Sequence, residues 1–240
     1  MFEGSNLTDT RIKLLELSIE AEGYNKNVLL AIESLLPALK DLNIDHVGES
    51  ELTSSYIHPF IQALFAIDRD NTVAKCANIT TFDEDSRKRP DYAVDIFDSC
   101  TYDFTSCVGE VKPKNATQAS KVVDFVKLCT FAAEALKDGL NHFIFFQALD
   151  KEVTFYHMIY KAGIYATVEI GTVTIPTRKN DLVNIISCLD TMTTVAEIHA
   201  DIKHIEGANK ITYAPVLPLD IGSLKKSLPV KRKPSLSTIH

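Results

Sequence analysis

Two strand-like runs that follow Pro90 constrain this chain more than any other segment. Residues 91–97 form an apolar run, a short polar stretch follows, and a second run covers 104–112 before the next proline. Proline donates no hydrogen bond to a sheet, so it ends the second strand. The two runs are expected to pair as antiparallel strands. Because residues two apart on a strand point to one face, Glu110 and Lys112 project together.

Three side chains of this segment have the chemistry of a metal-dependent hydrolase. A divalent cation that prefers oxygen ligands needs carboxylates, and Asp91 and Glu110 supply two. Lys112 could position an attacking water and stabilise the negative charge that develops on a phosphate. This combination predicts phosphodiester hydrolysis with Mg²⁺ or Mn²⁺ as the cofactor. A solvent-exposed Glu-x-Lys pair on a surface strand has the same sequence pattern. The neighbouring elements are therefore needed to distinguish a catalytic site from a surface pair.

The elements around this segment follow the order helix, three strands, helix, strand. Residues 49–66 carry an apolar stripe at helical spacing, and residues 73–80 form a strand. Apolar residues recur at i, i+3, i+4 and i+7 over 117–138, and Gly139 follows as a stop. A nearly continuous apolar run over 142–149 predicts a central strand buried on both faces. The order predicts an α/β fold with a mixed central sheet.

Two more polar side chains are candidates for the same site. Glu51 lies in the first turn of the 49–66 helix, where an acid also favours the positive end of the helix dipole. Gln147 interrupts the buried strand, so its amide must find a hydrogen-bond partner. That partner is either a neighbouring loop or, on the active-site face, water or phosphate. The sequence leaves both alternatives open for each residue.

The flanking segments complete the predicted organisation. We expect N-terminal helices over 8–22 and 25–40, a hairpin of strands over 152–160 and 164–175, and closing helices over 181–189 and 194–205. Tyr156, Tyr160 and Tyr165 on the hairpin are interpreted as packing residues rather than base-stacking ones. Three regions follow: an N-terminal helical pair over 1–45, the central domain over 46–206, and a basic tail over 207–240.

Composition and charge exclude several classes of protein. With 45% hydrophobic and 24% charged residues in 240, the chain is expected to form a globular core. No apolar run approaches the ~20 residues of a membrane span, and the N-terminus lacks a hydrophobic signal core. The five cysteines are odd in number and widely spaced, which indicates reduced thiols. A net charge of −7 excludes a protein that coats nucleic acid by bulk electrostatics.

The motifs resemble those of the PD-(D/E)XK nuclease superfamily. Its signature matches Pro90-Asp91, an 18-residue gap, and Glu110-Val111-Lys112. The predicted element order matches its αβββαβ core, which is restriction-endonuclease-like. A narrower resemblance, to uncharacterised fungal proteins with this core, covers about residues 48 to 240. It rests on SELTSSYIHPF, KRPDYAVDI, GEVKPKN, DFVKLCTFAAEAL, FQAL, VTFYHMIYKAGIYATVEIGTVTIP and a basic tail ending in RKPSLST.

The resemblance implies roles for the candidate residues. Asp91 and Glu110 would hold Mg²⁺ or Mn²⁺, with the Val111 carbonyl as a further ligand, and Lys112 would orient the water. Glu51 would bind a second metal or tune the first, and Gln147 would be an auxiliary polar contact. The implied reaction is hydrolysis of phosphodiester bonds, in DNA, leaving a 5′-phosphate.

Two other functions remain open at this stage. One is a binding module that keeps the nuclease fold but has lost cleavage or makes it conditional, and that holds nucleic acid or a protein partner. The other is an interaction protein in which Glu110 and Lys112 form only a surface ion pair, which contributes little to stability.

The basic tail predicts where the protein acts. Five cations and no acid lie between Gly222 and His240: Lys225, Lys226, Lys231, Arg232 and Lys233. Removing these five charges from the net −7 leaves −12 for the rest of the chain. Two basic clusters with a short spacer are typical of a signal read by a nuclear-import receptor, so an intracellular, nuclear protein is expected. A solvated tail, or one that holds DNA phosphates, is the alternative.

Overall fold

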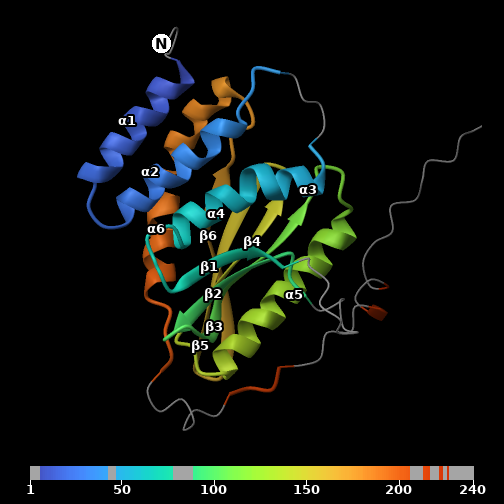
Figure 1. Ribbon diagram of the computed structural model, residues 1–240. Helices are drawn as coiled ribbons and strands as arrows, with labels where there is room; N and C mark the ends of the chain where they lie inside the picture. Colours follow the sequence, from blue (N-terminus) through green and yellow to red (C-terminus); the bar gives the residue numbers. More distant parts are fainter. Residues whose placement is uncertain are drawn as a thin grey trace, which may run out of the picture.

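The computed structural model describes residues 6–42, 47–77, 89–205, 213–216, 222–223 and 226 (Figure 1). A six-stranded sheet lies between helices, so the α/β class and the mixed sheet predicted from the sequence are confirmed. Its strands are β1 (Thr72–Cys76), β2 (Tyr92–Asp98), β3 (Thr101–Lys112), β4 (Phe143–Leu149), β5 (Glu152–Lys161) and β6 (Ile164–Thr174). The helices are α1 (Leu7–Glu20), α2 (Tyr24–Leu35), α3 (Glu49–Leu52), α4 (His58–Phe65), α5 (Gln118–Lys137) and α6 (Leu189–Ala200).

The strand order β1-β2-β3-β4-β5-β6 follows the chain, but one pairing differs in direction from the rest. β3 and β4 are parallel, whereas the other pairings of this sheet are antiparallel. Parallel neighbours need a crossover connection, and α5 supplies it. Since α5 leaves β3 just after Lys112 and returns to Phe143, its first turns lie beside the end of β3.

Alternating side chains on β4 and β5 divide the core into two layers. Phe145 and Tyr156 are cross-strand partners on one face, and Phe125 of α5 packs against both rings. The next partners, Phe146 and Phe155, point to the opposite face. There Phe155 meets Phe65 of α4 at a ring distance of 6.2 Å. The sheet is therefore buried on both faces, as the apolar run of β4 predicts.

Gly109 lets two aromatic rings meet above β3. Its neighbours in the sheet are Tyr92 on β2 and Phe146 on β4. The Phe146 ring covers the Gly109 backbone, and its centroid lies 5.8 Å from that of Tyr92. This packing fixes β3 immediately before Glu110.

The helix predicted over 49–66 is continuous, but its pitch changes. α3 passes into a π-helical turn, η2 (Thr53–Ile57), and then into α4. Pro59 stands in the first turn of α4 and has no N–H to donate into the preceding turn. A wider π turn directly before the proline accommodates that missing bond.

The helical pair at the N-terminus lies on the α4 side of the sheet (Figure 1). α2 packs against α4 and α6, and α1 packs against α2. A 3₁₀ turn, η1 (Leu36–Ala38), continues α2 through Pro37. The predicted helices over 8–22 and 25–40 thus correspond to α1 and to α2 with η1.

The closing helices differ from the predicted ones. Residues 181–189 lie largely in a 3₁₀ helix, η4 (Lys179–Cys188), instead of an α-helix. α6 begins five residues before the predicted start at 194, because Met192 joins Val195, Ala196 and His199 in one buried stripe. It ends at Ala200 instead of Ile205.

Several predicted features lie outside the described residues. They include the end of the 73–80 strand and all but Lys226 of the tail's five cations. Residues 213–216, at the start of the tail, are described and contact the β5–β6 hairpin. The hydroxyl of Tyr165 donates to the carbonyl of Ala214, and the N–H of Ala214 donates to the hydroxyl of Tyr160. The predicted hairpin of β5 and β6 is confirmed, and its tyrosines have packing roles. None of the described helices is long and apolar enough to cross a bilayer.

Candidate functional site

Three of the predicted site residues meet at one end of β2 and β3. Asp91 immediately precedes β2, and Glu110 and Lys112 end β3, its antiparallel neighbour. The N–H of Val111 donates to Oδ2 of Asp91 at 2.9 Å, which fixes this carboxylate. Side-chain exposure is 13% for Asp91, 2% for Glu110 and 18% for Lys112. The cluster is therefore mostly desolvated and opens to solvent near the lysine.

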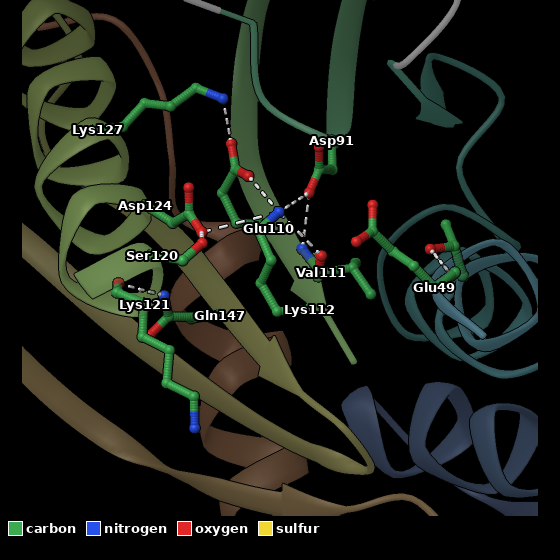
Figure 2. A network of polar contacts seen from close by, with 11 residues as sticks. Glu49, Asp91, Glu110, Val111, Lys112, Ser120, Lys121, Asp124, Lys127 and Gln147 are labelled. Atoms are coloured by element: carbon green, nitrogen blue, oxygen red, sulfur yellow. Dashed lines mark hydrogen bonds and ion pairs between the residues drawn. The ribbon is translucent and has the colours of Figure 1, made fainter. Parts of the chain in front are cut away.

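The ammonium group of Lys112 lies among the oxygens of this cluster (Figure 2). Its nitrogen is 3.2 Å from Oδ2 of Asp91 and 3.2 Å from the carbonyl oxygen of Val111. It is also 3.5 Å from Oε2 of Glu110 and 3.7 Å from Oδ2 of Asp124. Four oxygens, from the residue before β2, from β3 and from α5, thus converge on one positive charge.

Helix α5 supplies residues that the sequence analysis missed. Lys127 donates to Oε1 of Glu110, and Ser120 donates to Oδ2 of Asp124 at 3.2 Å. Figure 2 shows these side chains on the face of α5 that points toward Glu110. Ser120, Asp124 and Lys127 are spaced four and three apart, so they form a polar stripe on one helix face. The signal available in the sequence was this polar stripe at helical spacing within residues 117–138.

The acid of α3 that faces the cluster is Glu49. Figure 2 shows its carboxylate directed toward Val111 and Asp91, and its charge raises the pKa of Lys112. Glu51 is exposed, and within the described residues it has no hydrogen bond or ion pair to Asp91 or Lys112. The structure therefore brings Glu49 toward the site and leaves Glu51 at the surface.

Gln147 lies beside Glu110 in the sheet and, like Glu110, contacts α5. The two residues are register partners in the parallel β3–β4 pair. The amide nitrogen of Gln147 donates to the carbonyl of Lys121 in α5 at 2.8 Å, and the side chain is buried. The partner is a helix carbonyl instead of a loop, so this amide fastens the first turns of α5 to the sheet (Figure 2).

Burial and the excess of acids shift the ionisation of the cluster. Burial and the neighbouring Asp91 raise the pKa of Glu110 to about 8, against the opposing charge of Lys127. Burial would raise the pKa of Asp91 as well, but hydrogen bonds from Glu110 and Val111 and the charge of Lys112 hold it below its ordinary value. Lys112 keeps a raised pKa despite burial, because four carboxylates surround it. The site is thus short of positive charge.

These residues fit a divalent cation of the Mg²⁺ class. Oxygens of Asp91, Glu110 and Val111 surround one cationic nitrogen, that of Lys112. Mg²⁺ and Mn²⁺ prefer hard oxygen donors of this kind. Within the described part of the chain, no group of three or more His, Cys, Asp and Glu residues could hold a metal. The carboxylates of Asp91 and Glu110 and the carbonyl of Val111 would be the protein ligands, and the remaining positions would belong to water or substrate.

Contacts behind the cluster position Asp91. The hydroxyl of Tyr92, the next residue, lies 2.8 Å from Nδ1 of His58 in α4. The carbonyl of Asp91 accepts from the N–H of Ala77 at 2.9 Å. The start of β2 is thus held from both sides.

Comparison with known proteins identifies no relative. A scan of protein-family models, a search of curated proteins and a search of solved structures each find no match to this chain.

Proposed function

We propose that this chain is a metal-dependent nuclease with a PD-(D/E)XK core, and that it hydrolyses phosphodiester bonds in DNA. One observation carries the proposal: oxygens of Asp91, Glu110 and Val111 converge around a single cationic nitrogen at the ends of adjacent strands. The restriction-endonuclease-like arrangement is supported by the element order and by the parallel β3–β4 pair that α5 connects. The signature residues in the sequence point to the same chemistry.

Each residue has a role in this proposal. Asp91, Glu110 and the Val111 carbonyl hold Mg²⁺ or Mn²⁺, and the bound metal supplies charge stabilisation and a more acidic water. Lys112 orients the attacking water and stabilises negative charge on the phosphate. Glu51 remains the acid that the resemblance assigns to a second metal, but the geometry favours Glu49.

The charge balance of the cluster supports the binding of a divalent cation. Two ammonium groups face four carboxylates, namely Lys112 and Lys127 against Glu49, Asp91, Glu110 and Asp124. Fully ionised, the cluster would carry two net negative charges in a mostly desolvated setting, which is costly. A divalent cation would balance that charge, and the raised pKa of Glu110 relieves the imbalance by protonation.

One observation favours a second candidate, a conditional or inactive nuclease fold that binds nucleic acid or a protein partner. A pocket that reaches Pro90, the residue before Asp91, is lined by three acids, Asp103, Glu134 and Asp138, against one arginine, Arg89. These acids would repel a phosphate backbone. Under this candidate, a cation-rich partner or the tail brings the polyanion to the site.

The basic tail supports a nuclear location for this activity. Its two clusters, Lys225-Lys226 and Lys231-Arg232-Lys233, would bind an import receptor. Neutralising both clusters should move a fluorescent fusion out of the nucleus, and unchanged nuclear accumulation would contradict this location.

Substitution of Lys112 tests the proposed chemistry. Lys112→Ala should abolish cleavage of plasmid and single-stranded DNA in Mg²⁺, while thermal unfolding in the presence of Mg²⁺ stays cooperative. Lys203→Ala is the matched control, because Lys203 is exposed and pairs only with Asp201 in the described structure. Full cleavage by the Lys112→Ala protein would overturn the assignment.

A further inference from the structure

The ammonium group of Lys112 and the proposed metal need the same oxygens. Lys112 contacts Asp91, Val111 and Glu110 at 3.2 to 3.5 Å, and these are the three oxygens assigned to the cation. Two cations in that space would repel each other strongly in a desolvated setting. The lysine must therefore leave these oxygens when a metal enters.

Asp124 is the acceptor to which the lysine can move. Its Oδ2 is the most distant of the four oxygens around the nitrogen, at 3.7 Å, and none of the assigned metal ligands is on α5. Figure 2 shows Asp124 on the opposite side of the Lys112 nitrogen from Asp91. The hydroxyl of Ser120 donates to the same carboxylate oxygen, which fixes its direction.

We propose that Asp124 is a positioning residue, which takes the ammonium group of Lys112 when a divalent cation displaces it from Asp91 and Val111. Lys112 is then a resident competitor of the metal, and Asp124 lowers the cost of displacing it. The same transfer keeps the lysine within reach of the metal-bound region instead of releasing it to solvent. This inference rests on the proposed function in one respect, which is that the site takes a divalent cation.

Calorimetric titration of Mn²⁺ into four proteins tests the exchange: wild type, Lys112→Met, Asp124→Asn and the double variant. Lys112→Met removes the competitor, so the Kd should fall at least about tenfold, and Asp124→Asn should raise the Kd at least about tenfold. In the Lys112→Met background, Asp124→Asn should change the Kd less than about threefold, because no ammonium group remains to be moved. Cleavage is not needed for this readout.

Each alternative gives a different result. If Asp124 were itself a metal ligand, or acted only through its charge, its substitution would weaken Mn²⁺ binding equally in both backgrounds, which would overturn the exchange. Tight Mn²⁺ binding by all four proteins, with the same Kd, would overturn it as well and leave the proposed nuclease in place. No Mn²⁺ binding by any protein, Lys112→Met included, would overturn both. Glu49→Gln serves as the charge control and should act alike in both backgrounds.

Discussion

Gly109 and Phe146 are register partners on parallel strands, and the ring of Phe146 lies where a side chain at residue 109 would be. An added methyl group at Gly109 would stand 2.1 Å from Cζ of Phe146 and 2.4 Å from Cε1. Real carbon atoms do not approach so closely, and Phe146 is fully buried against Tyr92 and Phe155. The residue after Gly109 is Glu110, so this contact also determines where the site carboxylate lies.

Gly109→Ala should therefore destabilise the protein by about 2 kcal/mol or more, as overpacking of a core does. Urea denaturation measures the change. In the Phe146→Leu background the same substitution should cost less than about 1 kcal/mol, because the shorter side chain leaves room. Gly48→Ala is the control, since nothing lies within 4 Å of a methyl group there. Equal costs of Gly109→Ala in both backgrounds would refute the close contact.

The two acids of α3 provide a matched pair. Glu49 is directed toward Val111 and Asp91, and Glu51 is exposed. We expect Glu49→Gln to lower cleavage and Mg²⁺ affinity several-fold, because it removes negative charge that faces the cluster. Glu51→Gln should stay within about twofold of wild type, as a surface charge does. The reverse ranking in the same titration and cleavage assays would restore Glu51 as the site acid.

Gln147 should contribute to the position of α5. Its amide nitrogen donates to the carbonyl of Lys121, and the Gln147 side chain is buried. Gln147→Met keeps most of the volume but removes the donor, so the free energy of unfolding should fall by about 1 kcal/mol. Cleavage should drop less than tenfold, through a change in KM as well as kcat. A loss of cleavage above a hundredfold with unchanged stability would instead show contact of Gln147 with the substrate.

A buried histidine should make the fold sensitive to acid. His199 stacks on Phe65 with a ring distance of 4.1 Å, and its Nε2 lies 2.9 Å from the hydroxyl of Ser106. Burial, with the positive charges of Arg69 and His142, lowers the pKa of His199 to about 3. The unfolded chain therefore binds a proton near pH 6.5 that the folded protein does not, so stability is complete above pH 6.5 and falls as the pH drops toward 3.

His199→Leu removes this difference in proton binding. Between pH 7.5 and 5.0 the wild type should lose about 2 kcal/mol more stability than the variant, as measured by urea denaturation. His142 and His157 also have pKa values lowered by burial, but they are present in both proteins and cancel. His204→Gln, at an exposed position, is the control. Identical pH profiles of wild type and His199→Leu would contradict this account.

The sequence predicts the order and nearly all the types of elements because their patterns are local. α5 has a helical period and a following glycine, and β4 has an apolar run too short for a helix. The structure deviates from these predictions where contacts distant in sequence, or the chemistry of a single residue, determine the type or the start of a helix. The π turn before Pro59 depends on the bond that the proline lacks, and the start of α6 depends on which side chains reach the core.

The site is predictable in part for the same reason. Period two on a strand places Glu110 and Lys112 together, and their neighbours follow from β2 pairing with β3. The spacing of α3 cannot choose between Glu49 and Glu51, since both lie in one turn and only the orientation of the helix selects the acid that faces β3. Asp124 and Lys127 come from the crossover helix, whose rotation about its axis is set by packing on Phe145 and Tyr156.

The most direct test of the central claim is calorimetric titration of Mg²⁺ into wild type and the Asp91→Asn/Glu110→Gln double variant, with DNA cleavage measured on the same samples. The account predicts that wild type binds Mg²⁺ and cuts DNA, and that the double variant remains folded and does neither. Both substitutions keep the side-chain shape, so circular dichroism should show an intact fold. Equal Mg²⁺ binding by the two proteins, or cleavage that persists in the double variant, would contradict the assignment of this cluster as a metal-dependent nuclease site.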